Sequence, residues 1–312
     1  METTLVSGAS GFVGSHLIGD MRRRGLPTRG VTRGATPGLV TVPSYGADMD
    51  WREYLKGIDT VVHLAARVHV MRETAVDPLT LFREANVKST INLARQAAES
   101  GVRRFVFVSS IKVNGERTEL GHPFTADNLP NPQDPYGFSK AEAEAELIAL
   151  GRETRMEFTI VRPPLVYGQG VRGNFRSLMK WAASGSPSIF SLFKNKRSFI
   201  YVANLCDLLI EVLDHPAAKD QVFLASDGHD LSTHELLTRM AHAAGRDPVT
   251  VPLPPSILRG LGLLTGRQNV IARLTESLQV DVTATCHSLG WYPPVPVDDA
   301  IKSLFEPRDL LR

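Results

Sequence analysis

The chain has 312 residues, of which 43% are hydrophobic and 22% are charged. These values are typical of a soluble globular protein with a large and a smaller domain, and they exclude a disordered or fibrous chain. The formal net charge of +2 comes from scattered Lys and Arg residues, so the charge does not indicate a nucleic-acid partner.

Cysteine and histidine spacing argues against a metal centre. Cys206 and Cys286 form no C-x-x-C pair, and no two histidines have the spacing of a zinc site. We therefore expect no metal and a reducing, cytoplasmic location. The chain shows neither a signal-type segment at its start nor 18 consecutive apolar residues, so we expect no membrane association.

The first pattern along the chain is a strand, a glycine turn and a helix. Residues 3–7 are apolar enough for a buried strand, and apolar residues at helical spacing follow the turn. Glycines at such a turn let the backbone approach a pyrophosphate, whose charge meets the free N–H groups of the helix. The pattern predicts a dinucleotide site that includes Gly8, Ser10, Gly11, Phe12, Val13 and Gly14.

The second predicted strand, residues 28–32, ends without the acidic residue that usually binds the adenosine ribose. Thr32 and Arg33 stand there instead. A guanidinium group suits a 2′-phosphate, so Arg33 favours NADP, with NAD as the alternative if Arg33 is a solvated loop residue.

Strands are also predicted near Val40 and over residues 59–64. We expect the adenine and the backbone-lined part of the cofactor pocket to involve Asp48, Met49, Leu64, Ala65 and Ala66. Residues 78–100 follow with helical spacing. Asn86 lies within this helix, where it either bonds across the active-site face or has a structural role.

A fifth strand over residues 104–108 delivers Ser110 to the carboxyl edge of the sheet, where ligands bind. Asp134 suits a helix cap and Pro135 the first helical position, so Tyr136 and Lys140 share one face of the helix that follows. We expect the Lys140 charge to lower the pKa of Tyr136, and the Ser110 hydroxyl to hold the reacting oxygen. A surface Tyr and Lys on an amphipathic helix is the alternative.

Strands over residues 157–161 and 221–226 complete the pattern, and Pro163 must end the first of them. The fold class is therefore α/β, a Rossmann doubly wound parallel sheet of about seven strands with a smaller α/β substrate domain. We assign residues 1–167 and 199–228 to the dinucleotide-binding domain. Residues 168–198 and 229–312 form the substrate-binding domain.

The glycine turn, Ser110 and the segment from Tyr136 to Lys140 resemble the extended short-chain dehydrogenase/reductases, the NAD-dependent epimerase/dehydratase family of sugar-nucleotide enzymes. The segments 109–116 and 162–168 look more narrowly like 4-ketoreductases that act on UDP-4-keto-6-deoxy-N-acetylhexosamine. Dehydratases of this group carry an Asp-Glu pair where this chain has Ile111 and Lys112, so dehydration is not expected.

The resemblance implies a role for each site residue. Tyr136 would be the acid/base, Lys140 would tune it and bind the nicotinamide ribose, and Ser110 would hold the C4 oxygen. Pro163 would contact the cofactor, and the substrate would meet Lys112, Asn174 and Arg197. For Arg197, the planar guanidinium suits a diphosphate, and a salt bridge at the domain boundary is the alternative.

The resemblance also implies a partner and an activity. We expect a UDP-sugar substrate, a homodimer paired through the helices around 78–100 and 136–150, and reduction of a 4-keto group with NADPH. The alternative is a UDP-hexose 4-epimerase with tightly bound NAD. A non-catalytic dinucleotide-binding regulator represents a different class, and such relatives commonly lose the tyrosine or lysine that this chain retains.

Overall fold

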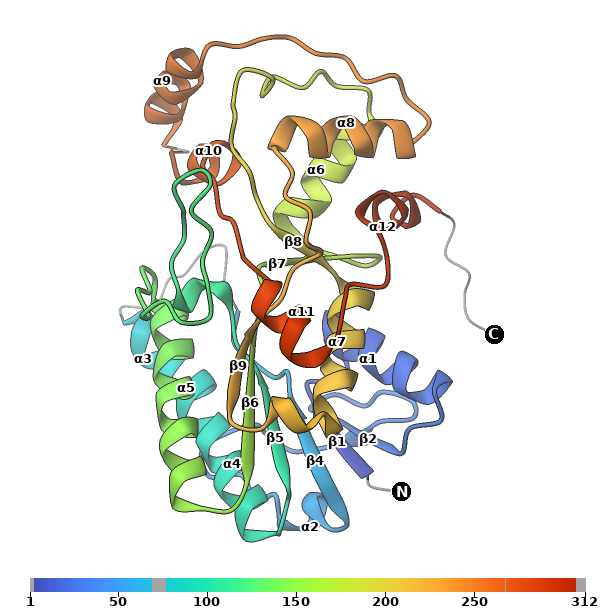
Figure 1. Cartoon of the computed structure of the whole chain (residues 1–312), viewed down its shortest axis with the longest axis vertical. Helices are drawn as coiled ribbons and strands as arrows, with labels where there is room; N and C mark the ends of the chain where they lie inside the picture. Colours follow the sequence, from blue (N-terminus) through green and yellow to red (C-terminus); the bar gives the residue numbers. More distant parts are fainter. Residues whose placement is uncertain (1–2, 69–76, 267, 307–312) are drawn as a thin grey trace.

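A computed structural model describes residues 3–68, 77–266 and 268–306. Its lower half in Figure 1 is a seven-stranded parallel sheet with the order β3-β2-β1-β4-β5-β6-β9. The strands are β1 (Thr3–Ser7), β2 (Thr28–Thr32), β3 (Val40–Thr41), β4 (Ile58–His63), β5 (Arg104–Val108), β6 (Glu157–Arg162) and β9 (Gln221–Leu224). The order reverses between β1 and β4, which is where open α/β sheets bind ligands.

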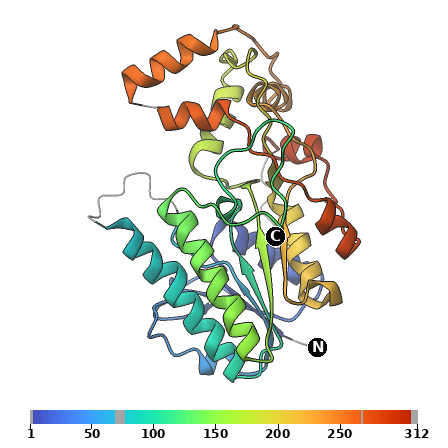
Figure 2. The same ribbon diagram turned by 60° about the vertical axis from the view of Figure 1, so that its left-hand side comes forward.

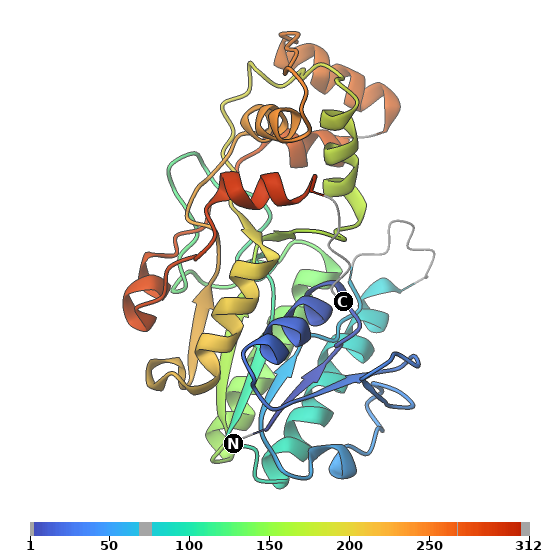
Figure 3. The ribbon, with the colours of Figure 1, turned by 90° about the vertical axis from the view of Figure 1, so that its right-hand side faces the viewer.

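Helices cover both faces of this sheet, which explains why its central strands are apolar runs without alternation. Figures 1 and 3 show α1 (Phe12–Arg23) and α7 (Val202–Asp214) on one face. Helices α4 (Ser89–Glu99) and α5 (Pro135–Glu153) bury their apolar residues against the other. The smaller elements around the sheet are α2 (Arg52–Leu55), α3 (Pro78–Phe82) and α11 (Thr283–Leu289). The predicted doubly wound fold is confirmed.

A second group of elements stands above the carboxyl ends of the strands (Figures 1 and 2). It contains a two-stranded parallel sheet and five helices with an apolar core of their own. These elements are β7 (Leu165–Tyr167), β8 (Phe199–Tyr201), α6 (Gly173–Ala183), α8 (Thr233–Ala243), α9 (Pro255–Thr265), α10 (Gln268–Thr275) and α12 (Val297–Ser303). None of the helices in the described residues is both long and apolar enough to cross a bilayer.

The helix predicted over residues 78–100 differs from expectation in one place. Between α3 and α4 the backbone widens into a π-helical segment, Arg83–Lys88. Asn86 lies in this segment, and its side chain pairs with both backbone groups of Arg67 and donates to Ser139 Oγ at 3.0 Å. Asn86 therefore ties the segment after β4 to α5, which matches the structural alternative. π segments are frequent at functional sites.

Candidate active site

The strand ends and the segments that follow them enclose a cavity of about 850 Å³. It is lined by residues from five places in the chain: Gly8, Ser10 and Gly11; Thr32 to Gly34; Pro43 to Ala47; Leu64 to Arg67; and Leu81, Glu84, Ala85 and Ser89. The structure thus brings seven predicted positions together in the lining of one cavity: Gly8, Ser10, Gly11, Arg33, Leu64, Ala65 and Ala66.

The glycine turn has no room for side chains. A Cβ on Gly8 would lie 2.8 Å from the backbone nitrogen of Ala65, and Gly8 has a φ of +71°. A Cβ on Gly14 would lie 2.2 Å from the Gly8 carbonyl oxygen. Gly11 caps α1 without a side chain, and the first turn of that helix holds no acidic residue. The exposed N–H groups and the close backbone approach fit a dinucleotide diphosphate. Phe12 and Val13 form the start of α1 beside this turn.

The end of β2 holds Thr32 and Arg33, as predicted, and contains no carboxylate. Thr32 Oγ1 is hydrogen bonded to Ser10 Oγ at 2.6 Å. The Arg33 guanidinium lies 5.9 Å from the centre of the Tyr45 ring. Tyr45 donates its hydroxyl to the Val31 carbonyl at 2.7 Å and accepts from the Gly8 N–H at 3.0 Å. Tyr45 therefore joins β2 to the glycine turn, a role that the sequence did not reveal.

The two residues predicted at the adenine, Asp48 and Met49, lie away from the cavity wall. The Met49 side chain is buried in the apolar core with Trp51 and Leu55, because the chain turns inward there to begin α2. Asp48 is exposed, and neither residue lines the cavity. Their neighbours from Pro43 to Ala47 form the wall at this point instead.

The three predicted catalytic residues meet at the end of β5. Asp134 caps α5 by accepting from the Gly137 N–H at 2.7 Å, and Pro135 takes the first helical position, as predicted. This places Tyr136 so that its hydroxyl is hydrogen bonded to that of Ser110. One turn later, Lys140 is buried and donates to the Val108 carbonyl at 2.8 Å.

The expected effect of Lys140 on Tyr136 is wrong for this structure. Burial raises the pKa of the Tyr136 phenol above its ordinary value, the nearby Asp134 charge raises it further, and only the bond to Ser110 lowers it. Burial also lowers the pKa of Lys140 to about 7. Its ammonium faces the Val108 carbonyl and lies 4.3 Å from the centre of the Phe107 ring. With Tyr136 neutral, the site can donate a proton, and it becomes a base only when a positive charge is added nearby.

The predicted substrate residue Lys112 has two acidic partners. Its ammonium forms ion pairs with Glu116 at 2.7 Å and with Asp134. The backbone N–H of Lys112 donates to Ser110 Oγ at 3.3 Å. Lys112 thus connects the turn that holds Ser110 to the helix that begins with Tyr136.

The other two predicted substrate residues stand farther out. Asn174 is exposed in the first turn of α6. Arg197 donates to the Glu276 carbonyl at 3.0 Å, and burial lowers the pKa of its guanidinium to about 10. Arg197 therefore contacts a backbone carbonyl and, among the described residues, does not form the domain-boundary salt bridge that was the alternative. Pro163 is buried just after β6 and accepts from the Ile111 N–H at 2.9 Å, so it holds the Ser110 turn in place.

Within the described residues, no group of three or more His, Cys, Asp and Glu side chains is arranged to hold a metal ion. Both cysteines are buried free thiols. The arrangement instead provides a glycine turn suited to phosphates at the end of β1 and, two strands away at the end of β5, a hydroxyl, a phenol and an ammonium group. Such a set can exchange a proton with an alcohol or a carbonyl next to a bound dinucleotide.

Comparison with known proteins agrees with this chemistry. Residues 4–225 match the model of the NAD dependent epimerase/dehydratase family. The chain belongs to this family. The predicted family resemblance and the expectation of an enzyme are therefore confirmed.

Two relatives and one solved structure match nearly the whole length of this chain. It is 43% identical to UDP-glucose 4-epimerase of Vibrio cholerae over 307 residues, which cover 96% of this chain and 94% of the relative. It is 27% identical to N-acetyl-alpha-D-glucosaminyl-diphospho-ditrans,octacis-undecaprenol 4-epimerase of Escherichia coli O157:H7, over 96% of this chain and 93% of the relative. The solved structure of MoeE5 in complex with UDP-glucuronic acid and NAD has a TM-score of 0.78 at 25% identity and covers 97% of both chains.

Proposed function

We propose that this family member is a UDP-sugar 4-epimerase that works with bound NAD. The observation that carries the proposal is the 43% identity to a UDP-glucose 4-epimerase over 96% of the chain. The adjacent Ser110, Tyr136 and Lys140 supply the residues that such a reaction needs. This proposal replaces the expected 4-ketoreductase with the alternative that the similarity favours.

In the proposed reaction Tyr136 exchanges a proton with the oxygen on C4. When bound, NAD would supply hydride transfer at C4 and, in its oxidised form, a positive charge in the site. That charge favours ionised Tyr136, which takes the proton of the C4 hydroxyl and later gives it back. Ser110 donates its hydroxyl to the same oxygen, and Lys140 keeps α5 against the end of β5.

NAD is a better proposal than the expected NADP. The family is described as NAD dependent, and MoeE5 was solved with NAD. The reason for expecting NADP was Arg33, which is exposed and lies over the Tyr45 ring. Arg33 nevertheless lines the cofactor cavity, so the proposal of NAD rests on the family and on MoeE5 and not on this residue.

The substrate would lie between the sheet and the elements above it. We propose that residues 168–198 and 229–312 form the substrate-binding domain, with Arg197 and Asn174 toward the UDP diphosphate. Arg197 is already held by the Glu276 carbonyl, and a guanidinium with remaining donors suits phosphate oxygens. We propose that Lys112 positions the Ser110 turn and the start of α5 through its ion pairs with Glu116 and Asp134, and that it does not bind the sugar directly.

The test is to purify the protein, release and identify any retained nucleotide, and incubate the protein with UDP-glucose, UDP-galactose and their N-acetylated forms. The proposal expects retained NAD and interconversion at C4 without net cofactor consumption. The Tyr136→Phe variant is the matched control, because it keeps the cofactor cavity. Stoichiometric NADPH oxidation with UDP-4-keto-6-deoxy-N-acetylglucosamine, and no interconversion, would restore the 4-ketoreductase. A protein that binds NAD but turns over none of these sugars would point to the regulator class.

A further inference from the structure

A loop far along the chain from the glycine turn packs directly on it. The loop runs from Gly168 to Gly173, between β7 and α6. Gly170 and Gly173 have φ values of +86° and +69°, and the Val171 N–H donates to the Gly168 carbonyl at 3.1 Å. These left-handed positions favour glycine and fold the loop back toward α1.

Contacts on both sides fix this loop. The Gln169 carbonyl is hydrogen bonded to His16 Nε2 at 3.0 Å, which fastens the loop to the second turn of α1. The Gln169 side chain donates to the Ser303 carbonyl at 2.9 Å, which fastens it to α12. A Cβ on Gly168 would lie 2.4 Å from Val202 and 3.5 Å from the Phe12 ring. The loop is therefore a packed strap over the start of α1.

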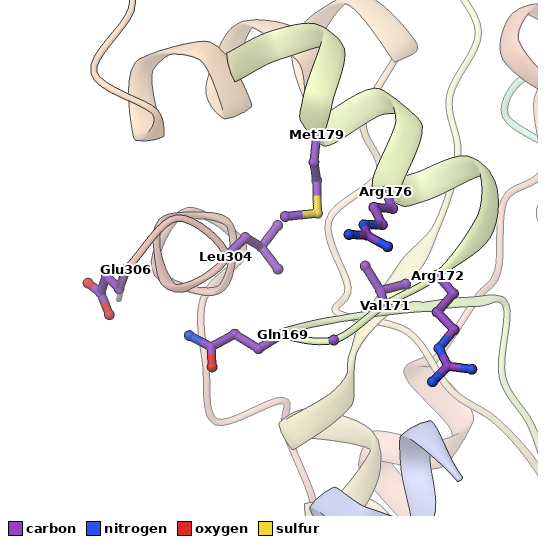
Figure 4. Close-up of a pocket in the computed structure, with 8 residues that line it drawn as sticks. Gln169, Val171, Arg172, Arg176, Met179, Leu304 and Glu306 are labelled. Carbon is purple, nitrogen blue, oxygen red and sulfur yellow. The ribbon is translucent and has the colours of Figure 1, made fainter. Parts of the chain in front are cut away.

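The strap borders two cavities, and Arg172 lines both. One, of about 430 Å³, lies between the strap and the residues from Ser10 to His16 that begin α1. The other, of about 380 Å³, is bounded by Arg176, Met179 and Leu304 (Figure 4). Figure 4 shows the two guanidinium groups apart: Arg176 points into the second cavity, whereas Arg172 points away from it toward the blue ribbon of α1. The Arg172 guanidinium therefore lies toward the first cavity, which is also lined by Ser10 and Gly11 of the glycine turn.

The charges at this cavity are unbalanced. Arg172 has no ion pair or hydrogen bond within the part of the chain that the structure describes, and the adjacent start of α1 carries free N–H groups and no acidic residue. Both features attract an anion, and a guanidinium fork binds two phosphate oxygens at once. The sequence separates these groups by about 160 residues, so only the fold brings them together.

We propose that Arg172 binds the diphosphate of the dinucleotide and that the strap from Gly168 to Gly173 closes the cofactor site on the side opposite the cavity lined by Thr32 and Tyr45. The diphosphate then lies between the α1 N–H groups and the Arg172 guanidinium. This clamp slows cofactor release, which suits an enzyme whose cofactor is regenerated within each turnover. The inference rests on the proposed NAD site but not on epimerisation.

Arg176 offers a matched control. It lies four residues after Arg172 and is also exposed, but of the two cavities it lines only the second. Substituting it removes the same charge from the same region without touching the glycine turn. Any effect of general charge on NAD binding will therefore appear in both variants.

The experiment measures the NAD dissociation constant and the release rate of NAD for the wild-type protein, Arg172→Gln and Arg176→Gln. Loss of a charged hydrogen bond predicts roughly 10- to 100-fold weaker binding and faster release for Arg172→Gln. Arg176→Gln should stay within about twofold of the wild type. Affinity should also fall less steeply with salt in Arg172→Gln. His16→Ala removes the hydrogen bond that holds the strap to α1, so it should also speed NAD release. Thermal denaturation of each nucleotide-free variant checks that it is folded.

Equal NAD affinity and release in Arg172→Gln and the wild type would overturn the clamp and leave the proposed function intact. An equal loss in Arg172→Gln and Arg176→Gln would also overturn it, because the effect would then be one of overall charge. A wild-type protein that binds no NAD would overturn the clamp and the proposed function together.

Discussion

The chemistry of single residues here depends on what surrounds them. Tyr136 and Lys140 are both enclosed, so the phenol is harder to ionise and the ammonium easier to deprotonate than in water. Each group would therefore be nearly neutral in the ligand-free protein above about pH 7. A positively charged cofactor and a polar substrate would change that balance, which couples acid/base chemistry to binding.

Tyr136→Phe should lower turnover by about 10² to 10⁴-fold, because it removes the group that exchanges the proton. The variant loses one hydroxyl bonded to Ser110 and keeps the ring against Phe82, so NAD retention and folding should be unchanged. Steady-state assay of C4 interconversion with nucleotide analysis checks this. A near-normal rate would remove Tyr136 from the mechanism.

The low pKa of Lys140 predicts a pH dependence of stability. Between pH 7 and the ordinary lysine pKa of 10.5, the unfolded chain binds a proton that the folded chain lacks, so the free energy of unfolding rises with pH. One such group contributes at most about 1.4 kcal/mol per pH unit. In the nucleotide-free protein, the free energy of unfolding of the wild type minus that of Lys140→Met should therefore be flat below pH 7 and rise from pH 7 to pH 9, as the cost of the buried charge is relieved. Urea denaturation at each pH measures it, and parallel curves would contradict the low pKa.

At the scale of elements, the junction between β1 and α1 is the most tightly packed point of the proposed dinucleotide site. Gly14 lies inside α1, yet its missing Cβ is what lets the helix start against the Gly8 carbonyl. Gly19, five residues later in the same helix, has only the end of the Arg23 side chain nearby, at 3.6 Å from an added Cβ. Substituting the two glycines therefore distinguishes the effect of backbone contact, at Gly14, from the effect of helix propensity, at Gly19.

Gly14→Ala should destabilise the protein by about 1 to 3 kcal/mol or more and weaken NAD binding, because the turn must open to admit the methyl group. Gly19→Ala should instead stabilise it by about 0.5 to 1 kcal/mol through the better helix propensity of alanine. Chemical denaturation and NAD titration of both variants test this. Similar effects at the two positions would show that packing at the turn is not limiting.

At the scale of the whole molecule, Asp227 joins the parallel sheet to the elements above it. It follows β9, and its carboxylate accepts from the Tyr167 hydroxyl at 2.8 Å, the Tyr201 N–H at 2.9 Å and the Asn204 side chain at 2.8 Å. These donors belong to β7, β8 and α7. One half-buried carboxylate therefore connects three elements that join the sheet to the part above it.

Asp227→Ala should lower the free energy of unfolding by roughly 2 to 5 kcal/mol, because it leaves buried donors without an acceptor. Asp247→Ala, at an exposed position, should change it by less than about 0.5 kcal/mol. Thermal and urea denaturation provide the comparison. A small effect at Asp227 would mean that water or a rearranged side chain replaces the carboxylate.

The sequence by itself determined the features that depend on local interactions. The alternation of apolar strands and helices, the glycine turn and the capped helix that begins at Pro135 were all predictable, because each is decided by residues within a few positions. The spacing of Tyr136 and Lys140 follows from helix geometry. Ser110 was predictable because strand ends in a parallel sheet share one edge.

Only the tertiary structure decided the features that depend on burial and on distant segments. The direction of the Tyr136 pKa shift, the burial of Met49, and the ion pairs of Lys112 depend on groups that other segments bring into contact. Tyr45 and Arg172 reach the glycine turn from about 37 and 160 residues away. Desolvation and long-range contact have no signature in a local pattern, so the fold could be predicted from the sequence whereas the electrostatics and the full lining of the site could not.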